Sequence, residues 1–305
     1  MQKLFSIFAQ FVEKVFHKKM YYYGMNAHNI LGKTAVKSSV GFWYVGNVFD
    51  SHDIAYGIVN NGIVEAEGTK LVEAILHEHL AYKPLFTLYD VGSNTGYYSI
   101  LTAFLGKEKT QVYSFEPIVE HTAVEAETVK LNRLEKYVTI VPGAVSNTIG
   151  TAIIHLSGSG TTLHKDFLGG ATVPSREVTL DTIDNVVKKQ NVAVPDFMKI
   201  DVEGSELEVL QGAMNTIRSS VPIIWYESAL RMETLSYQNP NFFEVQTLLK
   251  DLGYTVYRCG VTDLISSVSD VPDGVSMWLA LHPEKHERVI SFLKKQYKVI
   301  VGNHT

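Results

Sequence analysis

The chain has almost no cysteine. Its 305 residues include a single one, Cys259, which excludes an intramolecular disulfide framework and a zinc site built on several thiolates. Uninterrupted apolar runs of about 18 residues are also absent, so the sequence offers no membrane-spanning helix. Positive charge is not in excess either, because 27 Lys and Arg stand against 32 Asp and Glu, for a net charge of −5. Since nucleic-acid binders concentrate basic residues to neutralise phosphates, we expect no nucleic-acid partner.

What is present is the composition of a folded globular protein, with 46% hydrophobic and 19% charged residues. The length exceeds that of a usual single core. We therefore predict an N-terminal extension over residues 1–80 and a main domain over 81–305.

The N-terminal extension opens with a predicted amphipathic helix over residues 1–19. Its apolar face packs against its own domain or a dimer mate, or it makes peripheral contact with a membrane surface helped by its lysines. No small-residue cleavage site follows the apolar stretch Leu4–Val12, which argues against a secretory signal. Residues 41–62 are aromatic and rich in β-branched residues, and Asn61-Gly62 is a turn signal, so we predict a small strand-bearing section there, with Ile58–Gly62 as a strand and its turn.

From residue 84 onward the pattern predicts strands and helices in alternation, after a helix over 67–79. The predicted strands are 85–90, 111–115, 137–141, 196–201 and 221–227, and the predicted helices are 97–105, 118–131, 205–219 and 242–252. Such alternation requires right-handed βαβ crossovers, hence an α/β fold with a mostly parallel sheet. The last two strands, 254–259 and 275–281, have no helix between them and predict an antiparallel edge hairpin. An insertion over 151–178, rich in Gly, Ser and Thr, is long enough to cover a cleft.

The stretch from Asp90 to Ser99 is the most informative, because a buried strand runs into a glycine-bearing turn and then a helix. Open α/β sheets bind nucleoside ligands at such places. Gly92 and Gly96 are expected to let the backbone approach a ligand closely, with Asn94 between them. Their spacing is not that of a dinucleotide fingerprint, and a carboxylate at Asp90 would repel a pyrophosphate but hold an ammonium group. S-adenosylmethionine carries an ammonium, a sulfonium and no phosphate.

A second carboxylate, Glu116, ends the next strand and is placed to accept hydrogen bonds from both ribose hydroxyls of an adenosine. Glu116 would do so for NAD as well as for the methyl donor, so it indicates adenosine binding without choosing the cofactor. After the third strand, Ala144 and its neighbours supply a small apolar wall for the adenine.

These motifs resemble a known family. Asp90 to Ser99, Phe115-Glu116-Pro117, Val178 to Asp181 and Met198 to Glu206 together look like the FkbM-type methyltransferases, over residues 85–230. The resemblance implies a class I methyltransferase (Rossmann-like) fold, S-adenosylmethionine as cofactor, and O-methylation of a hydroxyl on a sugar, glycoconjugate or related natural product.

Methyl transfer to oxygen requires alignment of the two reactants and removal of the hydroxyl proton. Asp201 and Glu227 end the fourth and fifth strands, at the cleft mouth, with Glu203 just beyond Asp201. Either one of these carboxylates is the general base, with Asp201 also contacting the cofactor, or Asp201 and Glu227 hold Mg²⁺ against the acceptor oxygen. Glu203 and Glu206 have a plainer alternative, the first turn of the following helix.

Three further expectations concern the surroundings of this site. His164, in the insertion, is a candidate base, although a histidine in a polar insertion is more often just exposed. Lys199 is expected to point to the opposite face of its strand from Asp201 and to pair with an acid. Tyr97, Tyr98, Trp225 and Tyr226 offer rings for stacking an acceptor, but Trp225 more often fills a core in such an apolar strand.

Two alternatives remain open from the sequence: an NAD-dependent oxidoreductase, and a non-catalytic protein that binds S-adenosylmethionine. We expect a cytoplasmic enzyme, because the methyl donor is made and kept there.

Overall fold

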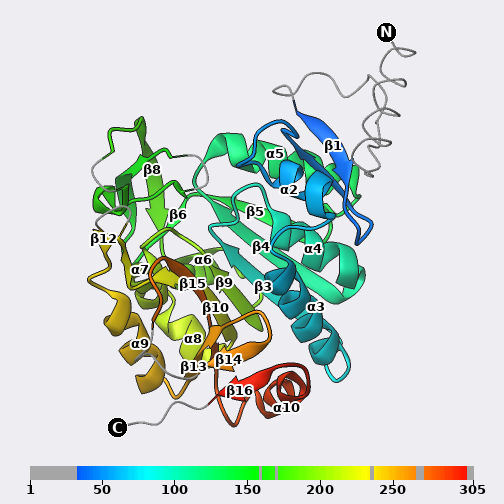
Figure 1. The fold of residues 1–305 in the computed structure, drawn as a ribbon, viewed down its shortest axis with the longest axis vertical. Helices are drawn as coiled ribbons and strands as arrows, with labels where there is room; N and C mark the ends of the chain where they lie inside the picture. Colours follow the sequence, from blue (N-terminus) through cyan, green and yellow to red (C-terminus); the bar gives the residue numbers. More distant parts are fainter. Residues whose placement is uncertain (1–32, 158–159, 169–170, 234–236, 266–270, 301–305) are drawn as a thin grey trace.

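The computed structural model describes residues 33–300, except 158–159, 169–170, 234–236 and 266–270. The helix predicted over 1–19 lies outside the described residues. Within them, nine strands form one mixed sheet in the order β16-β14-β13-β15-β10-β9-β3-β4-β5 (Figure 1). Their bounds are β3 Phe86–Val91, β4 Thr110–Glu116, β5 Val138–Pro142, β9 Phe197–Ile200, β10 Ile223–Ala229, β13 Thr255–Cys259, β14 Asp263–Ile265, β15 Val275–Leu281 and β16 Lys298–Ile300.

The five predicted βαβ strands, β3, β4, β5, β9 and β10, are confirmed and pair in parallel. The antiparallel pairing of β13 with β15 is confirmed as well. Its predicted place at the edge is wrong, because β15 also pairs with β10, and β14 and β16 continue the sheet beyond β13. Strand β14 pairs with backbone groups of β13 that an edge strand would leave open, and β16 in turn pairs with β14.

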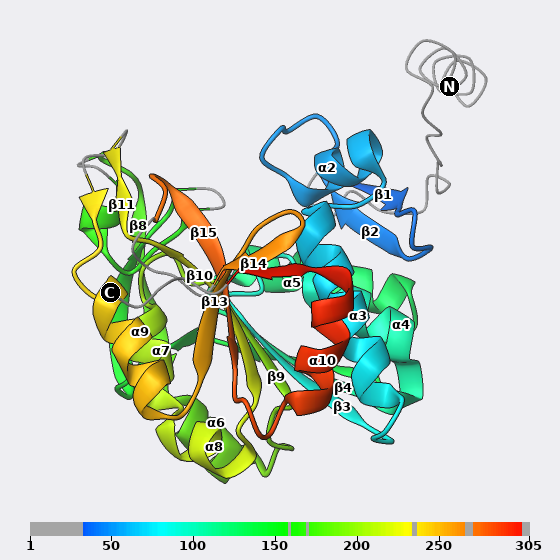
Figure 2. The ribbon, with the colours of Figure 1, turned by 60° about the horizontal axis from the view of Figure 1, so that its bottom comes forward.

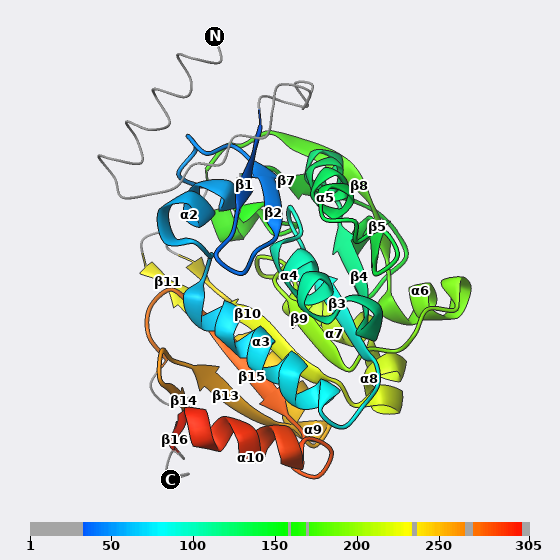
Figure 3. The ribbon, with the colours of Figure 1, turned by 90° about the vertical axis from the view of Figure 1, so that its right-hand side faces the viewer.

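Helices cover both faces of the sheet, which explains why the central strands are apolar throughout. Figures 2 and 3 show α3 (Ala66–Leu80) beside α10 (Glu287–Gln296). These two share a core with α4 (Tyr97–Gly106) and α5 (Val119–Leu131) on one face. The other face carries α6 (Ile183–Gln190), α7 (Glu206–Gly212), α8 (Met214–Ser220) and α9 (Phe242–Asp251). The single helix predicted over 205–219 is wrong, since the chain leaves helical geometry at Ala213 (φ −112°, ψ 8°) and forms two helices.

The N-terminal section is partly as predicted. Strands β1 (Thr34–Lys37) and β2 (Trp43–Gly46) form an antiparallel pair. The strand predicted at Ile58–Gly62 is wrong, because these residues end helix α2 (Ile54–Asn61) and form its cap. The Asp53 side chain caps its first turn, Ala55 and Ile58 are buried one turn apart, and Gly62 closes it in the left-handed region (φ 81°). Capping and burial at helical spacing thus outweigh the β-branched composition.

The predicted insertion begins and ends in strands. β7 (Gly150–His155) pairs antiparallel with β8 (Ser175–Asp181), and β6 (Ala144–Val145) pairs parallel with β8. Short elements complete the description: η1 (Lys107–Lys109), η3 (Lys165–Leu168), β11 (Arg231–Met232) and β12 (Tyr237–Gln238). In Figure 1 the three-stranded sheet and the N-terminal section lie on opposite sides of the upper end of the molecule. No helix in the described part of the chain has the length and apolar character needed to span a membrane.

Candidate active site

A cavity of about 550 Å³ lies at the carboxyl ends of β3, β4, β9 and β10. Parallel strands bring their carboxyl ends to one edge, so residues distant in sequence meet there. The N-terminal section and the insertion contribute further walls, through Lys33 to Glu65 on one side and Ile154 to Leu163 on the other. Among the predicted site residues, those that line the cavity are Gly92, Asn94, Glu116, Ala144, Asp201 and Glu227; those that do not are Asp90, Gly96 and His164.

Both glycines of the loop after β3 have left-handed backbones, with φ of 73° at Gly92 and 80° at Gly96. A Cβ at Gly92 would collide with the backbone carbonyl oxygen of Asp201, and one at Gly96 with the side chain of Glu125. Close approach of a ligand to the cavity-lining Gly92 stays a prediction, and the structure adds a second reason for both glycines. They are needed because the loop packs tightly on the chain's own neighbouring segments.

Asp90 is buried behind this loop. One carboxylate oxygen accepts hydrogen bonds from the Ser99 amide (3.0 Å) and hydroxyl (2.7 Å), which fixes the start of α4. The other oxygen lies 3.6 Å from the Lys199 ammonium. Burial raises the pKa of Asp90, and the Lys199 charge opposes that rise. Asp90 therefore does not contact the cavity itself. It affects the site through Ser99 and Lys199, which it contacts.

A second buried acid, Glu125 of α5, supports the loop from the opposite side. Its Oε2 accepts hydrogen bonds from the hydroxyls of Ser114 (2.8 Å) and Ser93 (3.4 Å), and its Oε1 has no hydrogen-bond partner. Burial raises the pKa of Glu125 to about 8. Glu125 could not be identified from the sequence, because the apolar residues of α5 do not gather on one face and so do not mark which of its acids is buried.

Glu116 lies in the cavity wall beside Phe115, Pro117 and the small residues Gly143 to Val145. Its two carboxylate oxygens accept hydrogen bonds from the backbone amides of Asn94 and Ile118, each at 2.9 Å. The His121 Nδ1 also lies 3.2 Å from the oxygen that accepts from Ile118. A carboxylate has about four lone-pair sites, so acceptor capacity remains for at least one ligand hydroxyl. Apolar walls next to an oriented carboxylate suit an adenosine, and the residues present therefore fit the cofactor that the sequence indicates.

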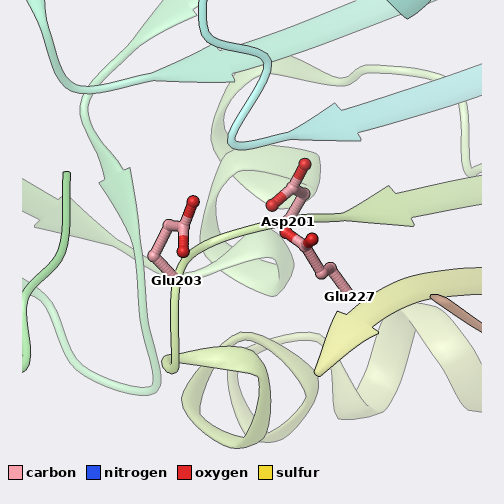
Figure 4. A group of neighbouring side chains, drawn as sticks. All are labelled: Asp201, Glu203 and Glu227. Carbon is pink, nitrogen blue, oxygen red and sulfur yellow. The ribbon is translucent and has the colours of Figure 1, made fainter. Parts of the chain in front are cut away.

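The opposite part of the cavity holds three carboxylates, Asp201, Glu203 and Glu227 (Figure 4). One oxygen of each lies within 4.8 Å of the others. The Lys199 ammonium is 3.0 Å from Asp201 Oδ2. Lys199 therefore pairs with an acid as predicted, but its predicted position on the opposite face from Asp201 is wrong. Residues two apart in an extended strand point to the same face.

The three carboxylates differ in protonation. Burial alone would raise the pKa of Asp201, but the Lys199 charge and a hydrogen bond with Glu227 bring it below its ordinary value. Burial and the Asp201 charge raise the pKa of Glu227 well above the usual range. The pKa values of these two acids are thus moved apart, and Asp201, beside Lys199, is the more acidic member of the pair.

Glu203 has a strained backbone, with φ of 53°. The Thr162 hydroxyl, from the insertion, donates a 2.6 Å hydrogen bond to the Glu203 carbonyl oxygen. Burial and the charge of Asp201 raise the pKa of Glu203 to about 8. Glu203 lies just before α7, so its alternative placement in the first helical turn is wrong, whereas Glu206 does begin that helix. A strained, half-buried acid in a cavity is a functional-site candidate that sequence patterns do not reveal.

The structure does not bring His164 into the cavity. Its Nε2 lies 3.6 Å from Glu208 on α7. The core role favoured for Trp225 is confirmed, because this side chain is 1% exposed and stacks on Phe197. Tyr98 does line the cavity, and its hydroxyl donates a 2.6 Å hydrogen bond to Glu65.

The oxygens of the three carboxylates are of the kind that binds Mg²⁺. However, the ammonium of Lys199 already compensates the charge of Asp201 from one side. The arrangement as it stands can hold, share and accept protons at the end of a cavity whose other end suits an adenosine.

Comparison with known proteins agrees with this chemistry. The family model described as "Methyltransferase FkbM domain" matches residues 90–256. The hexuronic acid methyltransferase AglP of Haloferax volcanii is 31% identical over 144 residues, which are 43% of this chain and 52% of that protein. The chain thus spans about half the length of this curated relative.

Two solved structures are similar to this chain at low identity. The FkbM methyltransferase of Methylobacillus flagellatus has 15% identity and a TM-score of 0.43, covering 74% of this chain and 60% of that one. The precorrin-6y C5,15-methyltransferase of Geobacter metallireducens has 14% identity and a TM-score of 0.42, covering 72% and 89%. Because the family model covers more than half of the chain, including the glycine-bearing loop and all three carboxylates, the chain belongs to the FkbM methyltransferase family.

Proposed function

We propose that the enzyme transfers a methyl group to a hydroxyl oxygen of a sugar or glycoconjugate. The observation that carries the proposal is the group of acids Asp201, Glu203 and Glu227 at the cavity wall, with one oxygen of each within 4.8 Å of the others and the Lys199 ammonium 3.0 Å from Asp201. The sugar class is supported by the name of the AglP relative, which acts on a hexuronic acid.

Residues of the loop and of β4 hold the cofactor in this proposal. Glu116 accepts hydrogen bonds from the ribose hydroxyls, and Ala144 lies against the adenine. Asp90 acts through the loop and Lys199, since it does not line the cavity. When bound, S-adenosylmethionine supplies an electrophilic methyl group on a positively charged sulfur, and a cavity rich in carboxylates favours that charge.

Asp201 accepts the hydroxyl proton of the acceptor in this mechanism. Lys199 keeps the Asp201 carboxylate ionised, so it is ready to receive a proton at neutral pH. The protonated Glu227 hydrogen bonds to Asp201 and orients it, and the pair can then share the additional proton. The same contact keeps the carboxylate aligned as the acceptor oxygen approaches the methyl group.

The Mg²⁺ alternative makes a distinct prediction. If a cation, rather than a carboxylate alone, activates the acceptor hydroxyl, EDTA should abolish turnover and added Mg²⁺ should restore it. We expect turnover to survive EDTA, because Lys199 already supplies the positive charge next to Asp201.

The function itself is tested by mass spectrometry. The full chain is incubated with a deuteromethyl-labelled donor and a panel of glycans, and each product is fragmented to locate the label. We expect one labelled methyl group on a sugar oxygen. Label on a nitrogen, or transfer only to non-sugar acceptors while the donor still binds, would refute the proposal.

A further inference from the structure

The acceptor end of the cavity is walled by the N-terminal section, which the family model does not cover. Asp50, Asp53 and Glu65 from this section line the cavity together with Lys33. Glu65 is tied to the catalytic carboxylates through side chains. It accepts the Tyr98 hydrogen bond at 2.6 Å, and the Tyr98 ring lies 5.5 Å from the Lys199 ammonium, which pairs with Asp201.

The charge of the cavity is strongly negative. The acids among its described lining residues are Asp50, Asp53, Glu65, Glu116, Asp201, Glu203 and Glu227. The lysines there are Lys33 and Lys199. With Glu203 and Glu227 counted as uncharged and the histidines as neutral, the lining residues carry five carboxylates and two ammonium groups. Of the five, Asp50 and Glu65 are solvent-exposed, and the Asp53 oxygens accept hydrogen bonds from the backbone amides of Asn47 and Ala55. The bound cofactor, with a net single positive charge, leaves this excess only partly compensated.

The positive groups are also poorly suited to bind an acid. Lys199 is already engaged by Asp201 and Asp90, and it lies 3.4 Å from the Gly92 carbonyl oxygen. No arginine lines the cavity within the described part of the chain. Arginine is the residue whose planar donors match a carboxylate in two parallel hydrogen bonds. A sugar carboxylate entering this space would meet mainly like charges, from the exposed Asp50 and Glu65 and from the half-buried Asp201.

We propose that the acceptor is a neutral or amino-bearing sugar and that the cavity discriminates against uronates. This inference rests on the proposed function, since it assumes that the acceptor is a sugar. It separates this chain from its AglP relative, whose name specifies a hexuronic acid. Asp50, Asp53 and Glu65 act here as specificity residues through their charge, without taking part in proton transfer.

The test uses three glycosides that share one aglycone and one ring configuration: the β-glucoside, the β-glucuronide and the 2-amino β-glucoside. Their binding to the full chain loaded with S-adenosylhomocysteine is measured by calorimetry at low and high salt. We expect the glucuronide to bind at least about tenfold more weakly than the other two, because like charges a few ångströms apart in a partly desolvated site repel by more than 1 kcal/mol. This deficit should shrink as salt screens the repulsion.

A pair of matched variants assigns the effect to the cavity. Glu65→Gln removes one charge and keeps a hydrogen-bond acceptor for Tyr98, so the glucuronide deficit should shrink by about threefold. Glu67→Gln removes the same charge two residues along the chain, from an exposed side chain that does not line the cavity. It should leave the deficit unchanged.

The binding measurement tests the inference about specificity, and the methyl-transfer measurement tests the proposed function. Equal or tighter binding of the glucuronide, or an equal response to the two variants, would overturn the inference even if a sugar is methylated. The predicted binding order without methyl transfer to any sugar would support the inference and refute the proposed function. Absence of binding by all three glycosides would overturn both.

Discussion

The carboxylates at the two ends of the cavity have different partners. At the cofactor end, Glu116 and Asp90 accept hydrogen bonds from backbone amides, and Asp90 from a hydroxyl as well. At the acceptor end, Asp201, Glu203 and Glu227 face one another, with Lys199 as their close cation. The hydrogen bonds at the cofactor end fix the shape of the loop after β3 and the start of α4. The arrangement at the acceptor end holds like charges together, which raises pKa values and prepares proton transfer.

We expect the largest effect on catalysis from loss of the Asp201 charge. Asp201→Asn keeps the size of the side chain but removes the proton acceptor, so kcat should fall by about 10³-fold. Steady-state kinetics with a labelled donor measures this. Binding of S-adenosylhomocysteine, followed by calorimetry, should change far less. The control, Asp251→Asn, alters an exposed acid at the end of α9. Unchanged turnover in Asp201→Asn would show that the chemistry lies elsewhere.

A change at the cofactor end should act on folding instead. Gly92→Ala places a Cβ against the Asp201 backbone and forces a side chain into a left-handed conformation. The free energy of unfolding, measured in urea, should fall by about 3 kcal/mol or more. Gly160→Ala is the control, because a Cβ there meets nothing within 4 Å. Equal losses in the two variants would mean that the loop tolerates far more movement than its packing indicates.

The buried acid behind the loop should make stability depend on pH. The pKa of Glu125 is raised from 4.5 to about 8, so the folded protein keeps a proton that the unfolded chain releases. Its contribution is fully present below pH 4.5 and is lost as the pH rises through about 8. Glu125→Gln should therefore lose roughly 4 kcal/mol less stability than the wild type between pH 5 and 9. Parallel urea titrations test this, and identical pH slopes would contradict it.

At the acceptor end, the same type of substitution should change the pH profile of catalysis. Glu203, with a pKa of about 8, ionises as the pH rises and adds negative charge beside the proton acceptor. We expect kcat/KM of the wild type to rise about threefold through that range, and Glu203→Gln to flatten this rise. Glu208→Gln, which removes an acid on α7 outside the cavity, serves as the control. A rise that persists in Glu203→Gln would assign it to another group.

The two ends also differ in how much of them could be predicted. Most of the cofactor end comes from one continuous stretch, from Asp90 to Pro117, in which a strand, a glycine-bearing turn and a helix succeed one another, and Gly143 to Val145 add a wall from the third strand's end. Such local patterns can be recognised in a sequence. The meeting of Asp201 with Glu227 followed from the parallel arrangement, because strand ends converge at one edge.

The acceptor end is formed by residues that are far apart in the sequence and that no local pattern connects. Glu65 reaches it through Tyr98, and the insertion reaches it through Thr162. Burial raises the pKa of Glu203. Lys199 lies on the same face as Asp201 because side chains two residues apart in a strand point to the same side, a rule that the prediction did not use. In the N-terminal section, a segment with β-branched residues forms helix α2, because the Asp53 side chain caps its first turn and Ile58 packs in the hydrophobic core.

The sequence by itself determined the alternating strands and helices, the loop after β3 and the acids at the strand ends, since each depends on neighbours in the chain. Only the tertiary structure decided which acids are buried together, which one a lysine keeps ionised and which distant segments close the cavity. Burial and charge pairing depend on what packs around a side chain, and that is set by contacts between residues far apart in sequence.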